Sequence, residues 1–161
     1  MKTQLCALAS GLALAVAGTA AFAGSSGDTY QNGYNNDAAI TQAYNGNATA
    51  KIVQQDVKNV AKATQDQNWF GNAKIDIYQD GYRNFADAKQ SHTMNSDSKI
   101  VQLGDLNVAN TTQTWGSNQN SDVYQRGYNN TANVTQTGSN LSATTVQVGY
   151  RNVSTITQTG W

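Results

Sequence analysis

The sequence predicts an all-β fold, a cross-β solenoid of six strand-turn-strand repeats with two strands in each rung. Three observations support this prediction. A glutamine recurs from Gln31 to Gln147 at spacings of 23, 25, 23, 23 and 22 residues. Within each repeat, small or β-branched residues alternate with polar ones, which is the period of a strand. The chain has no proline and only 12% charged residues, so its composition neither breaks strands nor holds them apart.

The first 23 residues have the features of a secretory signal peptide. Lys2 supplies the positive charge, residues 5–16 form an apolar run, and Ala21-Phe22-Ala23 places small residues at the expected cleavage site. We therefore expect an exported chain that begins at Gly24. Cleavage would remove Cys6, the one cysteine of the chain, so a disulfide is not expected. No later apolar stretch is long enough to cross a membrane, and we predict no membrane insertion.

The remainder of the chain divides into a short N-terminal segment and six repeats. Internal periods between 20 and 50 residues are typical of solenoids, in which each repeat stacks only on its neighbours. The predicted boundaries are 1–23 for the signal peptide, 24–28 for the N-terminal segment, and 29–46, 47–71, 72–94, 95–117, 118–139 and 140–161 for the repeats.

Every repeat places amide side chains at three fixed positions: a first Gln, an Asn five residues after it, and a second Gln eleven residues after the first Gln. Buried amides cost free energy unless they form hydrogen bonds. In stacked rungs, equivalent amides lie about 4.8 Å apart and can bond to each other, so we predict three amide ladders. The ladder residues are Gln31, Asn36, Gln42, Gln54, Asn59, Gln65, Gln79, Asn84, Gln90, Gln102, Asn107, Gln113, Gln125, Asn130, Gln136, Gln147, Asn152 and Gln158.

Two further sets of positions complete the repeat. A glycine two residues after the first Gln is expected to form the turn, because glycine tolerates positive φ. These turn glycines are Gly33, Gly81, Gly104, Gly127 and Gly149, with Asp56 in the second repeat. Small and β-branched residues on the amide-bearing face are expected to fill a thin core. The core residues are Ile52, Ile77, Ile100, Val123, Ala38, Ala61, Ala86, Ala109, Ala132, Ile40, Val134 and Ile156.

The sequence gives no indication of catalysis. The one histidine, His92, lies between repeats, and no cysteine or glutamate remains after residue 23 to assist it, so we interpret it as a solvated turn residue. Aspartates occur singly, without the spacing of a calcium loop. Lysines and arginines are scattered among aspartates, which disfavours nucleic-acid binding. We therefore predict no enzyme activity, no metal and no cofactor.

The pattern Gln-x-Gly-x-x-Asn-x-Ala-x-x-x-Gln, seen in QNGYNNDAAITQ, QDGYRNFADAKQ and QRGYNNTANVTQ, resembles the curlin repeat of curli subunits, the secreted functional amyloids of bacterial biofilms. The resemblance covers nearly the whole mature chain. It implies an amyloid protomer that passes through an outer-membrane pore with the help of periplasmic accessory proteins. It also implies polymerisation with other copies of the chain at the cell surface, on a nucleator subunit.

Three features depart from the family pattern. The major curli subunit usually carries a glycine-rich targeting segment before its first repeat, whereas this chain has only GSSGD. The second repeat lacks the glycine, and the link DQNWFGN is longer than most, so Trp69 and Phe70 are expected to bulge from the stack. Regular repeats favour the major subunit and the short segment favours the nucleator, so both assignments remain open.

A soluble adhesin or ice-binding solenoid is the alternative in another functional class. An outward row of threonines at Thr41, Thr64, Thr112, Thr135 and Thr157, interrupted by Lys89, raises this possibility. The residue two positions before each threonine varies, however, so the sequence predicts that a paired threonine grid is lacking. We therefore favour the fibre subunit.

Overall fold

The computed structural model describes residues 24–68 and 71–160. The predicted signal peptide and the expected bulge at Trp69 and Phe70 lie outside the described residues. The twelve strands are β1 (Ser26–Tyr34), β2 (Asp37–Ala43), β3 (Asn47–Val57), β4 (Val60–Asp66), β5 (Asn72–Tyr82), β6 (Phe85–Met94), β7 (Asp97–Asp105), β8 (Val108–Ser117), β9 (Asn120–Tyr128), β10 (Thr131–Gly138), β11 (Ser142–Tyr150) and β12 (Val153–Gly160). Among the described residues, no helix has the length and apolarity needed to cross a membrane.

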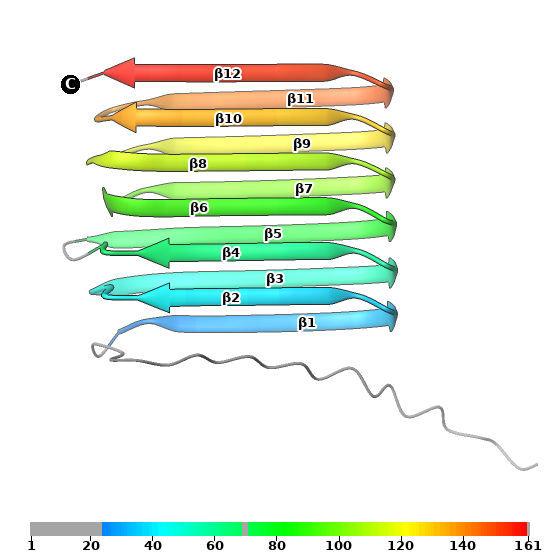
Figure 1. Cartoon of the computed structure of the whole chain (residues 1–161), viewed down its shortest axis with the longest axis horizontal. Helices are drawn as coiled ribbons and strands as arrows, with labels where there is room; N and C mark the ends of the chain where they lie inside the picture. The colour runs from blue at the N-terminus through cyan, green and yellow to red at the C-terminus, as the bar shows by residue number, and fades with distance from the viewer. Residues whose placement is uncertain (1–23, 69–70, 161) are drawn as a thin grey trace, which may run out of the picture.

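The strands form two parallel six-stranded sheets that face each other (Figure 1). Odd-numbered strands make one sheet, here sheet A, in the order β1-β3-β5-β7-β9-β11, and even-numbered strands make sheet B. Each odd strand and the even strand that follows it form one rung, so β1 and β2 are rung 1 and β11 and β12 are rung 6. The predicted solenoid fold is confirmed.

The pairing register places equivalent residues directly above one another. Gln54 pairs with both Gln31 and Gln79 in sheet A, and Gln65 pairs with Gln42 and Gln90 in sheet B. The two extra residues of the second repeat therefore leave the register of both sheets unchanged. They are accommodated in the connection between Asp66, where β4 ends, and Asn72, where β5 begins.

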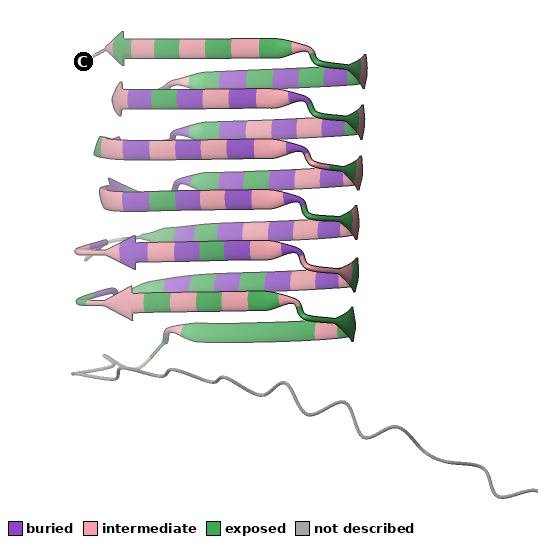
Figure 2. Cartoon of the chain, turned by 45° about the vertical axis from the view of Figure 1, so that its right-hand side comes forward, coloured by how far each residue is buried: buried purple, intermediate pink, exposed green. Residues whose placement is uncertain are grey.

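The core is a thin apolar layer between the sheets, visible as the buried positions that alternate along strands β3 to β11 in Figure 2. Isoleucines of sheet A, including Ile52, Ile77 and Ile100, are fully buried and belong to the same cluster as alanines of sheet B. The predicted core residues Ala61, Ala86, Ala109, Ala132, Val123 and Val134 are also buried. Ala38, Ile40 and Ile156 are only partly buried, because they belong to the end rungs.

The sequence reading missed part of the core. β1 begins earlier than expected, at Ser26, within the segment that we assigned to the N-terminal region. The sheet A strands also have an inward position four residues before the first Gln, and Ile75 fills it in rung 3 with no exposed surface. The position escaped notice because other rungs carry serine there, as at Ser98 and Ser121.

The turn glycines have positive φ, as at Gly104 (φ 106), but their role differs from the one expected. They lie inside the ends of the sheet A strands, and the residue two positions later makes the left-handed turn. In the fourth rung that residue is Leu106 (φ 57). Glycine at this position allows the rungs to approach closely, because a Cβ at Gly104 would overlap the carbonyl oxygen of Gly127. Asp56 takes φ 67 in place of a glycine.

Candidate functional site

The first-Gln column forms a continuous hydrogen-bonded ladder in sheet A. Each Nε2 donates to the Oε1 of the next rung toward the C-terminus, starting with Gln31 to Gln54 at 2.7 Å and ending with Gln125 to Gln147 at 2.8 Å. The intermediate bonds, from Gln54, Gln79 and Gln102, are 2.9, 2.7 and 2.9 Å long. The ladder therefore has a direction, which the sequence does not reveal.

The second-Gln column forms a parallel ladder of the same polarity in sheet B. Its bonds run from Gln42 to Gln65 at 2.8 Å through to Gln136 to Gln158, also 2.8 Å. The remaining bonds, donated by Gln65, Gln90 and Gln113, are 3.0, 2.9 and 2.9 Å long. All four of the inner side chains Gln65, Gln90, Gln113 and Gln136 are fully buried.

Every ladder glutamine after Gln31 also uses its second amide hydrogen to join the two sheets. Gln54 donates to the carbonyl oxygen of Asp37 in β2 at 2.9 Å, and Gln90 donates to that of Lys74 in β5, also at 2.9 Å. An amide has two donor hydrogens and one acceptor oxygen, so both donors and the oxygen of these buried side chains form hydrogen bonds. A residue without an amide cannot replace both bonds.

The asparagine column lies at the turn and runs in the opposite direction. Nδ2 of Asn107, Asn130 and Asn152 donates to Oδ1 of the preceding rung at 3.1, 2.9 and 2.9 Å. The same oxygen accepts the backbone N-H of the next asparagine, and Asn36 enters the column in this way, accepting from the N-H of Asn59 at 3.0 Å. These asparagines therefore fix the turn as well as the stack.

The opposite turn, which connects one rung to the next, contains functional residues that the sequence reading missed. In rungs 1 to 3, Asn45, Asn68 and Thr93 stack, with the N-H of Asn68 donating to Asn45 Oδ1 at 3.1 Å and the N-H of Thr93 to Asn68 Oδ1 at 2.9 Å. In rungs 4 to 6, a second glycine stack of Gly116, Gly138 and Gly160 replaces them. The change of residue type concealed the shared role.

The outer face of sheet B differs from the expectation. Threonines two positions after the outward row complete a paired arrangement in rungs 4 to 6, and Thr114 and Thr137 lie 3.1 Å apart between hydroxyl oxygens. The paired positions are Thr112 with Thr114, Thr135 with Thr137, and Thr157 with Thr159. The prediction that a paired grid is lacking is therefore wrong over these three rungs, because it considered only the preceding residues.

His92 also differs from a solvated turn residue. Its ring stacks on Trp115 of the next rung, with centroids 3.9 Å apart and planes 15° from parallel. The side chain is half-buried, and Ser91 Oγ lies 2.9 Å from Nδ1. The described residues contain no group of three or more His, Cys, Asp or Glu side chains placed to hold a metal ion.

Two carboxylates of neighbouring rungs make the stack sensitive to pH. Burial, followed by the nearby charge of Asp56 and a hydrogen bond to it, raises the pKa of Asp80. The folded protein thus binds this proton more tightly than the unfolded chain does. The contribution to stability is therefore present below the unfolded pKa and is lost as the pH rises through the folded pKa.

We expect Asp80→Asn to stabilise the stacked form at pH 7 and to have little effect at pH 3, where the wild-type carboxyl is already neutral. Denaturant midpoints at the two pH values measure the difference. Asp87→Asn is the control, since Asp87 pairs in register with Lys62 and should not reproduce this pattern. An equal effect of Asp80→Asn at both pH values would contradict the assignment.

Comparison with known proteins identifies the repeat. The family model of the curlin associated repeat matches residues 120–144, which include β9 and β10. No curated protein and no solved structure matches the chain significantly. The matched rung stacks in register on rungs that carry the same Gln, Asn and Gln positions. The chain therefore carries a curlin associated repeat at residues 120–144, within a β-solenoid whose other rungs repeat the same three amide positions.

Proposed function

We propose that this protein is the structural subunit of extracellular curli-like amyloid fibres and that it polymerises head to tail through its end rungs. Fibre formation would serve a biofilm matrix, cell aggregation and surface adhesion. The observation that carries the proposal is that both end rungs keep the ladder chemistry of the interior. Stacked strands with open edges are a template for further strands, and a heterologous contact that does not close generates a filament.

The two end rungs offer complementary halves of each ladder. In rung 1, Gln31 and Gln42 donate into the stack, so their oxygens remain to accept from a preceding rung. In rung 6, Gln147 and Gln158 each use one amide hydrogen on a backbone carbonyl, at 2.9 Å in both cases. The second hydrogen of each remains to donate to a following rung. Because all bonds of a ladder run in one direction, the donors that remain at rung 6 complement the acceptors that remain at rung 1.

The side-chain pattern continues across this contact. Placing β1 of a second copy on β11 sets Gly33 over Gly149 and Tyr34 over Tyr150, as in the interior register. Placing β2 on β12 sets Ile40 over Ile156, which would complete the burial of both. The joined stack would repeat every six rungs, or about 29 Å at the usual strand spacing.

The predicted export and partners belong to this proposal. A chain with a signal peptide and curlin repeats would pass through the periplasm and an outer-membrane secretion pore, assisted by accessory proteins, and add to a nucleator subunit. Uninterrupted ladders over six rungs favour the major subunit over the nucleator. Deleting the gene and asking whether all fibres disappear, or whether soluble subunits are released instead, would distinguish the two.

The decisive experiment blocks one end at a time. Gln31→Leu with Gln42→Leu changes side chains of rung 1 alone, and Gln147→Leu with Gln158→Leu changes side chains of rung 6 alone. We expect purified wild-type protein to form thioflavin-positive fibres that seed fresh monomer. A small fraction of either double variant should cap growth at one end, and the two together should stop growth at both ends.

Time-resolved imaging of seeded fibres measures the growth of each end. Thr41→Val with Thr157→Val is the control, because these outward residues of the same two rungs do not belong to the ladders. A wild-type protein that remains a stable monomer would overturn the proposal, and so would end-blocked variants that leave the growth of seeded fibres unchanged.

The threonine pairs of sheet B favour one second candidate, a soluble ice-binding solenoid. Rungs 4 to 6 present these hydroxyls at strand spacing, and β8, β10 and β12 carry no charged residue. Thermal hysteresis of the monomer would support this candidate, and Thr135→Leu should abolish it. A monomer without hysteresis that polymerises supports the fibre subunit instead.

A further inference from the structure

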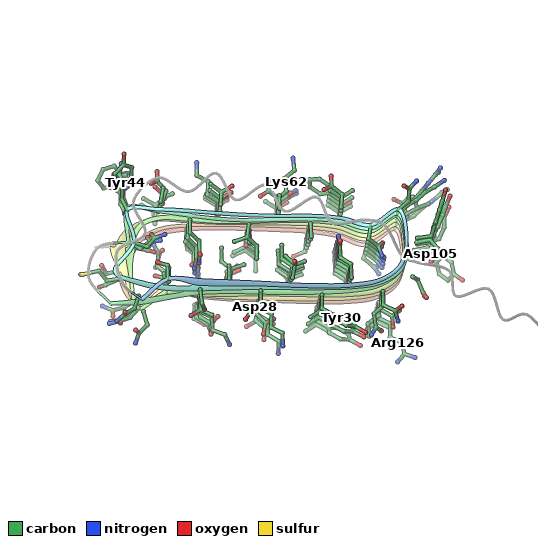
Figure 3. All side chains as sticks on the ribbon, turned by 90° about the horizontal axis from the view of Figure 1, so that it is seen from below. Asp28, Tyr30, Tyr44, Lys62, Asp105 and Arg126 are labelled. Carbon is green, nitrogen blue, oxygen red and sulfur yellow. The ribbon has the colours of Figure 1, made fainter. Side chains whose placement is uncertain are left out.

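The outer face of sheet A carries a column of alternating charge. Asp28, Lys51, Asp76, Lys99 and Asp122 lie above one another in register, and Thr144 ends the column in rung 6. Figure 3, a view along the stack, shows the outward side chains of each sheet superimposed in straight columns, with Asp28 and Tyr30 in neighbouring columns of sheet A. Alternation within one stack offsets like charges between neighbouring strands.

The neighbouring column alternates in side-chain size, in step with the alternating charges of the first column. It consists of Tyr30, Val53, Tyr78, Val101, Tyr124 and Val146. Tyrosine accompanies aspartate in the odd-numbered rungs, and valine accompanies lysine in rungs 2 and 4. Charge balance within the stack does not require this second alternation, so the combination indicates a surface that is shaped for a partner.

We propose that sheet A docks face to face on sheet A of a second copy of this chain, with the two stacks running in opposite directions. This inference rests on the proposed function only in that fibres would extend the same face. The two-fold axis would lie parallel to the strands, midway between β5 and β7. Such an axis sets each column against its own counterpart and reverses the order of the rungs.

Under this symmetry all charged positions of the first column meet an opposite or neutral residue. Asp76 faces Lys99 of the second copy, Lys51 faces its Asp122, and Asp28 faces its Thr144. In a third column, Lys74 faces Asp97. Electrostatic complementarity of this kind selects orientation and disfavours alternatives, because a shift of one rung would set aspartate against aspartate.

The same axis also matches size. Tyr78 of each copy faces Val101 of the other, and Tyr124 faces Val53, so each ring meets a small residue. The fourth column, which includes Asp80 and Arg126, sets these residues against Leu103 and Gln55 and brings no like charges together. A two-fold axis along the stack would instead set the tyrosine column against a different column and would lose the match.

The available area is sufficient for a specific contact. Seven residues from Ser26 to Asn32 across six rungs cover roughly 650 Å² per copy from strand dimensions. Two copies would bury about 1,300 Å², above the ~1,000 Å² that a specific interface needs. Sheet B lacks the match, because its outward charges lie in β2, β4 and β6 and none lies in β8, β10 or β12.

Site-directed cross-linking tests the pairing. Thr49 in rung 2 and Asn120 in rung 5 are exposed, belong to neither alternating column, and face each other across the proposed axis. Within one stack they are three rungs apart, about 14 Å, which a short bis-maleimide does not span. Fibres of Thr49→Cys and fibres of Asn120→Cys are formed separately from the mature chain, which contains no other cysteine, and are then mixed.

We expect a product that joins residue 49 to residue 120. Charge reversal of the whole face provides the sharper test: Asp28→Lys, Lys51→Asp, Lys74→Asp, Asp76→Lys, Asp97→Lys, Lys99→Asp and Asp122→Lys preserve alternation within each stack. Reversed fibres should pair with one another. Between a wild-type and a reversed fibre, however, like charges meet, and the product should fall about ten-fold, which corresponds to ~1.4 kcal/mol.

Exchange of Lys62 and Asp87, a register pair on sheet B, is the matched control and should leave the product unchanged. A dominant product between two copies of residue 49 would overturn the antiparallel arrangement. Thioflavin-positive fibres without any product would overturn the pairing and leave the proposed function intact. If no fibres form, the proposed function fails, and the same cross-link on the folded soluble chain then supports or overturns the pairing.

Discussion

Gly104→Ala is expected to destabilise the stack by about 2–6 kcal/mol, combining roughly 1–3 kcal/mol of backbone strain with a similar cost of overpacking. Gly104 has φ 106, a conformation that residues with a Cβ rarely adopt. The added methyl would overlap the carbonyl oxygen of Gly127 in the next rung. The rung spacing is fixed by backbone hydrogen bonds on both sides, so neither strand can move away. The denaturant midpoint of the stacked form measures the effect.

Gly149→Ala is the matched variant for this substitution. Gly149 has a similar φ of 115, but a Cβ there would meet only Asn152 Nδ2 at 3.7 Å, an ordinary contact, because β11 is the last strand of sheet A. We expect a smaller loss of stability in the single chain and a block of fibre growth at the rung 6 end. Equal stability losses in the two variants would show that stacking contributes nothing beyond backbone strain.

Gln102→Leu is expected to destabilise the stack by about 2–6 kcal/mol, since the buried side-chain amides of Gln79 and Gln125 each lose a partner at about 1–3 kcal/mol. Gln102 accepts from Gln79 at 2.7 Å and donates to Gln125 at 2.9 Å. It also donates to the carbonyl oxygen of Phe85 in sheet B at 2.9 Å. Leucine has a similar volume, so the loss reflects hydrogen bonding and not a cavity. Fibre growth should slow as well.

Gln55→Leu is the control, because it makes the same substitution at an outward position of the same sheet. Gln55 accepts from the Tyr78 hydroxyl at 3.0 Å and is only partly buried, so water can replace the lost bond. We expect a change within about 0.5 kcal/mol. Denaturant midpoints and thioflavin kinetics of both variants make the comparison. A loss in Gln55→Leu as large as that in Gln102→Leu would contradict the ladder assignment.

The strongest sequence signals were those that repeat without exception. The first Gln, the Asn and the second Gln occur in all six rungs, and they form the three hydrogen-bonded columns of the structure. The inward position of Ile75 was missed because its equivalents in the other rungs are glycine, alanine or serine. The corner of Asn45 and Asn68 was missed for the same reason, since glycine takes over that position in later rungs.

The sequence by itself determined the number of rungs, the strand period and the residues that stack. A solenoid repeats each contact once in every rung, so the residues that make the contact recur at the length of the repeat. Only the tertiary structure decided the polarity of the ladders and the left-handed turn residues such as Leu106. The turn residues depend on how the two sheets join within one rung. The direction of a hydrogen bond cannot be deduced from residue identity, because an amide both donates and accepts.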